Sequence, residues 1–193
     1  SRSVAIGREA LNQQNFDGNA YNVAVGFQAG LQVTTGIQNT IVGGSAGDAL
    51  TTGAYNVAIG YGALSAEDTL DGNTAIGFEA LKVQDGGTFN TTLGYQSGLA
   101  VSTGDQNTLL GTKAGDALTT GSNNIIIGYL ADASAVDVSN EITLGDANIS
   151  AFRCADQSIA ALSDGRDKAN VKDSSFGLDF IDSVRPVEFE WDF

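Results

Sequence analysis

Short apolar segments recur along this chain at a constant distance, and each one ends at a glycine. Seven of them begin with Val, Thr or Ile directly after an asparagine and end in Val, Ile or Leu: residues 23–25, 40–42, 57–59, 74–76, 91–93, 108–110 and 125–127. The glycines that follow stand 17 residues apart, from Gly26 to Gly145. A fixed period of this size is typical of stacked copies of one supersecondary unit, so the pattern predicts a repeat array.

Within each segment the side chains alternate between the two faces of a predicted strand. The first and third residues, such as Val57 and Ile59, form one apolar face. The middle residue and the glycine, such as Ala58 and Gly60, form a second face that is mostly apolar and often small. Because both faces are apolar, we expect each strand to be buried on both sides.

A second short element follows each glycine, with a small residue in its third position, as at Ala29 and Ala46. Turn residues come next, as in Thr51-Thr52-Gly53. Seventeen residues suffice for two short strands and two turns, so each period predicts one coil of an all-β, parallel β-solenoid. Stacking would align the asparagines in a ladder about 4.8 Å apart, and eight or nine coils would give a rod of roughly 40 Å.

The first and last copies of the repeat depart from the period. The first glycine, Gly7, lies 19 residues before Gly26, and we expect the two extra residues in the turn between Asn12 and Asn22. At the other end, the segment from Asn140 to Gly145 reads as a copy that has gained one residue. Irregular end copies are expected of a capped array.

Composition excludes several functional classes. The chain has 9 Lys and Arg against 23 Asp and Glu, a net charge of −14, which argues against nucleic-acid binding. It has no apolar run long enough for membrane insertion. With no His and one Cys, a transition-metal site is not expected, and no motif indicates a cofactor. We therefore expect no metal and no cofactor.

The composition changes after the array, and three regions are predicted. Residues 1–145 form the solenoid, residues 146–162 a final strand (147–152) and a linker (157–162), and residues 163–193 a short α/β segment. In the last region a helical pattern runs from Ser174 to Val184, and residues 187–191 alternate as a strand does.

The repeat resembles the head repeats of trimeric autotransporter adhesins, which also occur in phage tail-fibre proteins. The resemblance rests on segments such as Asn56–Gly60 and Asn73–Gly77. It implies a left-handed parallel β-roll that forms a homotrimer about its long axis. We expect the small Ala/Gly face of each strand to lie along that shared axis. Coils closed within one chain and coils interleaved among three chains both fit the repeat.

The C-terminal region resembles the start of the intramolecular chaperone domain of phage tail spikes and fibres, the peptidase S74 family. The matching residues lie in 163–171 and 185–191. The resemblance implies autocleavage with Ser163 as nucleophile and Lys168 as base, next to Asp164. A lysine can serve as the base only if its environment keeps it neutral. The family's domain continues well beyond Trp191, so we expect this chain not to cleave itself efficiently.

Together these resemblances predict a structural component of a phage tail fibre. We expect an extracellular virion protein, a rigid trimeric shaft or tip for host attachment, with other tail proteins as partners. An alternative function is recognition of a host-surface glycan or receptor by variable turns, with these candidate residues: Glu67, Asp68, Asp71, Lys82, Asp85 and Phe89. Less favoured alternatives are a glycan depolymerase using the acidic group at 67–71 and an ice-binding solenoid, suggested by recurring Thr-Thr pairs.

Overall fold

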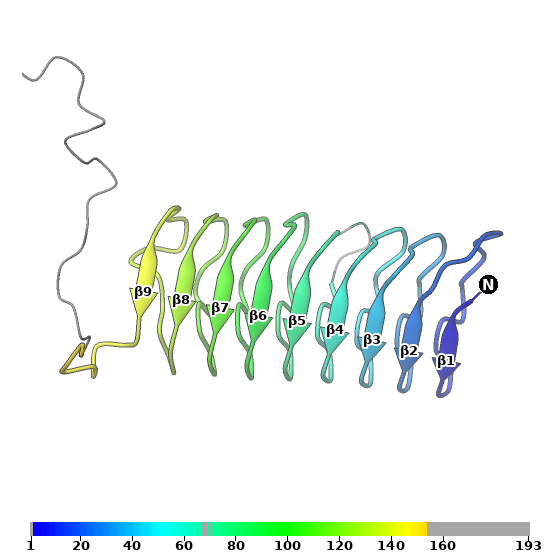
Figure 1. Ribbon diagram of the computed structural model, residues 1–193, viewed down its shortest axis with the longest axis horizontal. Helices are drawn as coiled ribbons and strands as arrows, with labels where there is room; N and C mark the ends of the chain where they lie inside the picture. The colour runs from blue at the N-terminus through cyan, green and yellow to red at the C-terminus, as the bar shows by residue number, and fades with distance from the viewer. Residues whose placement is uncertain (1, 67–68, 70, 154–193) are drawn as a thin grey trace, which may run out of the picture. The chain divides into compact units, whose positions relative to one another are not determined.

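A computed structural model describes residues 2–66, 69 and 71–153 of the chain, and these residues form one parallel β-solenoid (Figure 1). Each coil contributes one strand of three residues, and in the described residues the strands are β1 Val4–Ile6, β2 Val23–Val25, β3 Thr40–Val42, β4 Val57–Ile59, β5 Thr74–Ile76, β6 Thr91–Leu93, β7 Thr108–Leu110, β8 Ile125–Ile127 and β9 Ile142–Leu144. The predicted all-β, parallel β-solenoid with coils of about 17 residues is confirmed.

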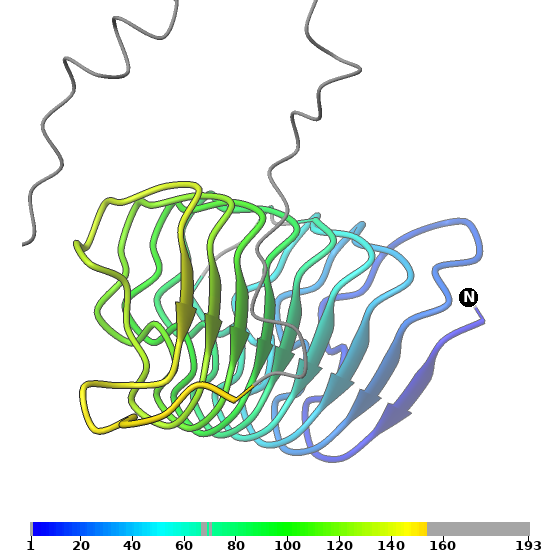
Figure 2. The ribbon, with the colours of Figure 1, turned by 60° about the vertical axis from the view of Figure 1, so that its left-hand side comes forward.

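The strands pair in chain order, each with the next, and in strict register. Val57 of β4 lies beside Thr74 of β5, and Ile59 lies beside Ile76. Figure 2 shows the strands side by side along one face, with the rest of each coil closing behind them. Because neighbouring strands lie about 4.8 Å apart, the nine strands of the described residues span roughly 38 Å. Each coil closes within one chain.

The segment after each glycine is a series of turns and not the predicted second strand. In the second coil it covers residues 27–32, where Gln28 and Gly30 have φ angles of 55° and 60°. Left-handed residues interrupt the extended conformation that a strand needs. The coils nevertheless stay bonded here, because the Gly30 N–H donates to the Ala46 carbonyl of the next coil at 2.9 Å.

The core lies inside the coils and is filled by small residues together with a few large aliphatic ones. The middle residue of β4, Ala58, and the small residue after its glycine, Ala63, are completely buried. The first and third residues, Val57 and Ile59, point outward and are only half-buried. The expectation of strands buried on both faces, with the small face turned to an axis shared by three chains, is therefore wrong. The coil is narrow, so only the small side chains fit inside it.

Two alternative arrangements fill the core beside the turn segment. In one arrangement a glycine precedes a buried aliphatic residue, as at Gly98 and Val101. In the other a leucine occupies the glycine's position and a glutamine the aliphatic one, as at Leu81 and Gln84, both fully buried. The Gln84 amide has no hydrogen-bond partner on either of its atoms. Leu81 therefore fills the space that Val101 fills in the other arrangement.

The predicted asparagine ladder is confirmed, and it runs inside the protein. The Asn73 N–H donates to Asn56 Oδ1 at 2.9 Å, and Asn73 Nδ2 donates to the Gly87 carbonyl at 3.0 Å. Both residues are fully buried. Each asparagine thus joins its neighbour in the stack to the opposite side of its own coil.

Other residues take the asparagine's position at the two ends of the ladder. At the N-terminal end the Ser3 hydroxyl accepts the Asn22 N–H at 3.2 Å. At the C-terminal end Asn124 Oδ1 accepts the Glu141 N–H at 2.9 Å. β9 keeps the 17-residue offset from β8, so Glu141 is the counterpart of Asn124. The expectation that the last copy gains a residue is wrong.

The evenly spaced glycines are required by the stacking of the coils. Gly60 has a φ angle of 132°, and a Cβ atom at this position would lie 2.2 Å from the carbonyl oxygen of Gly77. The same relation joins Gly77 to Gly94. The backbone of one coil thus occupies the space that a side chain of the previous coil would need.

The solenoid unit comprises Ser1–Ala151. Residues 147–152 do not form the predicted strand, since the Ile149 N–H donates to the Asp146 carbonyl at 3.1 Å in a turn. The predicted linker, helix and last strand, within 157–191, lie outside the described residues. No helix in the described part of the chain is long and apolar enough to cross a membrane.

Candidate functional site

The outer face of the sheet carries a row of aliphatic side chains, which we call the aliphatic stripe. It consists of the first and third residues of each strand, and its large, well-exposed members are Val4, Ile6, Leu93, Ile125, Ile127, Ile142 and Leu144. The strands are in register, so these side chains form two continuous columns along the rod. A contiguous apolar surface of this length is typical of an interaction site.

A column of aromatic residues borders the stripe on the side where the strands end, and we call it the turn-side column. Its members follow the conserved-period glycines directly: Phe27, Tyr61, Phe78, Tyr95 and Tyr129. Tyr61, Phe78 and Tyr95 stack on one another, with ring centroids 5.6 and 5.2 Å apart and interplanar angles of 18° and 9°. The ring faces of this column are therefore used in contacts between coils, and the ring edges face outward.

Three further aromatic residues border the stripe on the side where the strands begin, and we call them the loop-side column. Tyr21, Tyr55 and Phe89 each stand two residues before a strand and are 49%, 59% and 62% exposed. They come from every second coil, so their rings do not stack as those of the turn-side column do. Their φ angles of 55°, 63° and 57° lie in the left-handed region, which is uncommon for large side chains.

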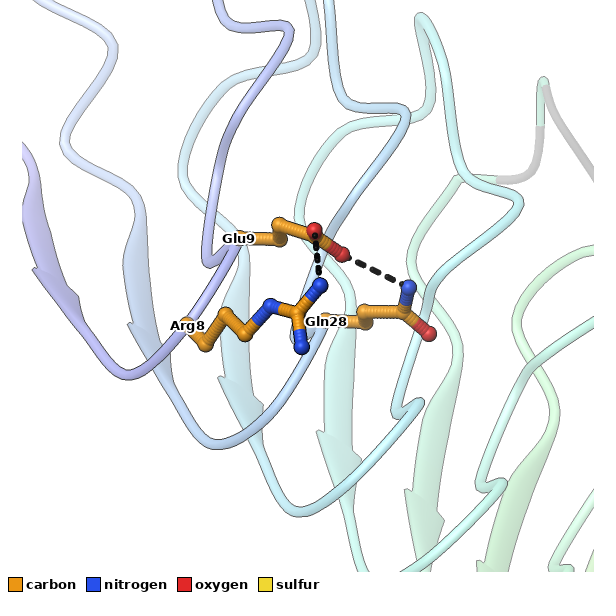
Figure 3. A network of polar contacts seen from close by, with 3 residues as sticks. All are labelled: Arg8, Glu9 and Gln28. Carbon is orange, nitrogen blue, oxygen red and sulfur yellow. Dashed lines mark hydrogen bonds and ion pairs between the residues drawn. The ribbon is translucent and has the colours of Figure 1, made fainter.

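A polar network lies at the first turn segment, next to the turn-side column (Figure 3). Gln28 Nε2 donates to Glu9 Oε2 at 2.8 Å, and Arg8 forms an ion pair with Glu9 Oε1 at 3.2 Å. The hydrogen bond from Gln28, together with the charge of Arg8, lowers the pKa of Glu9. The Arg8 guanidinium also lies 5.7 Å from the centre of the Phe27 ring.

The same arrangement recurs four coils further along the rod. Glu79 Oε2 accepts a hydrogen bond from Gln96 at 2.9 Å, and Lys82 Nζ donates to Glu79 Oε1 at 2.6 Å. The bond from Lys82 lowers the pKa of Glu79, and the same bond raises the pKa of Lys82. Lys82 is thus engaged within the turn segment and does not extend toward the predicted receptor loop.

The structure brings together only two of the residues predicted for receptor binding. The Phe89 N–H donates to the Asp71 carbonyl at 3.3 Å, so these residues are neighbours in adjacent coils. Asp71 Oδ1 accepts the Ala54 N–H at 2.7 Å, which gives this carboxylate a role in joining coils. Asp85 is exposed, and its N–H donates to the Ser102 carbonyl at 2.7 Å. Lys82 is bound to Glu79.

The remaining predicted site residues lie outside the described residues. They are Glu67, Asp68, Ser163, Asp164 and Lys168. Within the described residues, no group of three or more His, Cys, Asp or Glu side chains is arranged to hold a metal ion.

Two half-buried carboxylates are part of the turn segments and were not identified from sequence. Burial raises the pKa of Asp48, whose Oδ1 has no hydrogen-bond partner. Burial also raises the pKa of Asp132, and the charge of nearby Asp116 contributes. Sequence analysis also missed the exposed aromatic columns, although 17-residue alignment of the coils would have placed Tyr61, Phe78 and Tyr95 in one row.

Comparisons of the chain with protein-family models, with curated proteins and with solved structures find no match. The solenoid with its exposed outer face is therefore the basis for the functional argument.

Proposed function

We propose that this protein is a rigid, self-associating rod, a structural segment of a phage tail fibre that supports attachment to the host cell outside it. The observation that carries this proposal is the aliphatic stripe on an otherwise completely hydrogen-bonded rod. A single chain leaves these side chains in water, and a parallel second and third copy would cover them.

The size of the outer face suits such an association. From the loop-side column to the turn-side column it is about 20 Å wide, and with a length of roughly 38 Å it offers roughly 700 Å². A standard interface needs about 800 Å² from each partner. The stripe is aliphatic and free of charged residues at its exposed members, as the buried centre of an obligate interface is.

The interior of the solenoid suits a load-bearing role. The buried asparagines bond each coil to the next, and their amides also bond across the coil. The backbone of the turn segments is bonded between coils as well. A rod built in this way transmits force along its axis without a flexible joint between coils.

Light scattering and small-angle X-ray scattering test the proposal on the full chain. We expect the mass of three chains at micromolar concentration and a rod length set by the solenoid. Leu93→Asp with Ile127→Asp should give single chains, while Glu79→Gln, away from the stripe, should keep the assembly. A wild-type protein that stays a single chain at high concentration would overturn the proposal.

We further propose that Ser163 and Lys168 act in self-cleavage only within a longer precursor. The support for this is the residue pattern at 163–171 and 185–191. Intact mass spectrometry of the chain during prolonged incubation should show one uncut species. A chain extended beyond Phe193 by a complete chaperone domain should be cut, and Ser163→Ala in it should not. A clean cut next to Ser163 in the present chain would contradict the proposal.

A further inference from the structure

We propose that the loop-side column, Tyr21, Tyr55 and Phe89, is a binding surface for an extended, neutral, β-1,4-linked polysaccharide. This goes beyond a structural role and does not depend on the number of chains in the assembly.

The first support is that these rings are placed against the local preference of the backbone. In every other coil the same left-handed position holds glycine, asparagine or glutamine: Gln38, Gly72, Gln106, Asn123 and Asn140. Glycine and asparagine adopt this conformation with little strain, whereas a large aromatic residue does not. Strained residues that persist are characteristic of functional sites.

The second support is that packing does not account for the rings. All three are about half exposed or more, so they add little to the core. The rings of the turn-side column stabilise the rod by stacking on one another, and those of the loop-side column are separated by a full coil. Their faces are therefore available to a ligand, apart from the face of Tyr21 that the Arg2 guanidinium approaches at 5.9 Å.

The spacing of the rings selects the chemical class of ligand. Members of the column stand two coils apart, which is about 9.6 Å. An extended β-1,4-linked chain of pyranoses has a two-residue repeat of comparable length. The C–H groups on one side of a pyranose pack on an aromatic ring, so alternate sugars would meet successive rings.

Carboxylates beside the rings supply acceptors for sugar hydroxyls. Asp71 lies between the coils of Tyr55 and Phe89, and Asp105 lies one coil beyond Phe89. Each is oriented by a backbone donor: Ala54 N–H to Asp71 Oδ1 at 2.7 Å, and Thr88 N–H to Asp105 Oδ1 at 2.6 Å. With these carboxylates and a net charge of −14, the surface repels polyanions, which favours a neutral chain.

Pull-down on microcrystalline cellulose and on chitin beads, followed by calorimetry with cellohexaose and chitohexaose, tests the proposal. The variant Tyr55→Asn/Phe89→Asn is chosen because asparagine already occupies this backbone position at 123 and 140, so the fold should be kept. The matched control is Tyr61→Thr, which removes an exposed ring from the turn-side column and introduces the residue found at 112.

We expect wild-type protein to bind at least one of the two polymers and its hexasaccharide. The double variant should lose roughly tenfold or more in affinity, and the control should not. Binding to one polymer alone identifies its sugar. Absence of binding to both polymers, equal binding by the double variant, or loss of binding in the control would overturn the proposal.

Discussion

Asn90 stacks directly on Asn73: its N–H donates to Asn73 Oδ1 at 2.9 Å, deep inside the solenoid. Asn73 in turn donates through Nδ2 to the Gly87 carbonyl. One side chain therefore satisfies two buried backbone groups, in two neighbouring coils.

Asn73→Ala should leave the Asn90 N–H and the Gly87 carbonyl without partners. Since each unsatisfied buried group costs roughly 1–3 kcal/mol, we expect a loss of about 3 kcal/mol in the free energy of unfolding, measured by urea denaturation. Asn123→Gly is the control, because Asn123 is exposed and glycine occupies its position at 72. It should change stability by less than about 0.5 kcal/mol, and equal losses in both variants would contradict the role of the ladder.

Gly60→Ala should prevent the fourth and fifth coils from stacking. Its Cβ would meet the backbone of Gly77, which cannot move without displacing the sheet. We expect a loss of more than about 3 kcal/mol or failure to fold.

Gly62→Ala is a matched control for this substitution, two residues away. Gly62 also has a positive φ angle, 61°, but the nearest atom to its added Cβ is 3.7 Å away. Only the backbone preference is violated, so the expected loss is about 1 kcal/mol by the same denaturation measurement. A loss as large as that of Gly60→Ala would show that the close approach is not the cause.

The two ways of filling the core should be interchangeable. Leu81→Gly alone leaves a cavity beside the unpaired Gln84 amide and should cost about 3–5 kcal/mol. Leu81→Gly with Gln84→Val reproduces the combination seen at Gly98 and Val101, and we expect it to recover more than half of that loss. A double-mutant cycle by urea denaturation should give a coupling energy of about 2 kcal/mol, and purely additive effects would contradict the exchange.

Asp48 should make stability depend on pH in the direction opposite to an ordinary ion pair. Burial raises its pKa in the folded state, so the folded protein binds the proton more strongly than the unfolded chain. Stability is thus lost when Asp48 ionises and recovered as the pH falls through its folded pKa.

Asp48→Asn should therefore raise the Tm near neutral pH, and its advantage should shrink as the pH is lowered toward 4. Thermal melts of both proteins between about pH 4 and pH 7 measure this difference. Glu9, whose pKa is lowered, provides the comparison of opposite sign, because Glu9→Gln removes stability that the wild type has only above the folded pKa. A difference between Asp48→Asn and wild type that does not vary with pH would show that ionisation of Asp48 is not responsible.

The period of the sequence was enough to predict the class of fold, because it is a property of the whole stack. The positions of Gly60 and Asn56 follow from contacts that every coil repeats, so the ladder and the close approach could be foreseen. Which face of Val57–Ile59 points inward could not, because both faces are apolar and only the width of the coil decides between them. Small Ala58 fits inside the coil, and its larger neighbours remain outside.

The candidate site was harder to predict, because its residues are ordinary when taken singly. Tyr55 and Phe89 stand 34 residues apart and become one surface only when the coils are in register. Asp71 was correctly chosen as a neighbour of Phe89, but its bond to the Ala54 backbone depends on the stacked coil and is not visible in the sequence. Lys82 was placed in the wrong environment, since its partner Glu79 lies one turn earlier.

The constant offset between β3 and β8 makes the length of this protein adjustable in whole units. Removing residues 108–124 would join Asn107 to Ile125, the same kind of junction that Asn124 makes with Ile125 in the intact chain. The shortened molecule should lose about 4.8 Å and keep every remaining bond between coils. Insertion or loss of one repeat by recombination could therefore set how far the two ends are held apart, without the need to redesign either end.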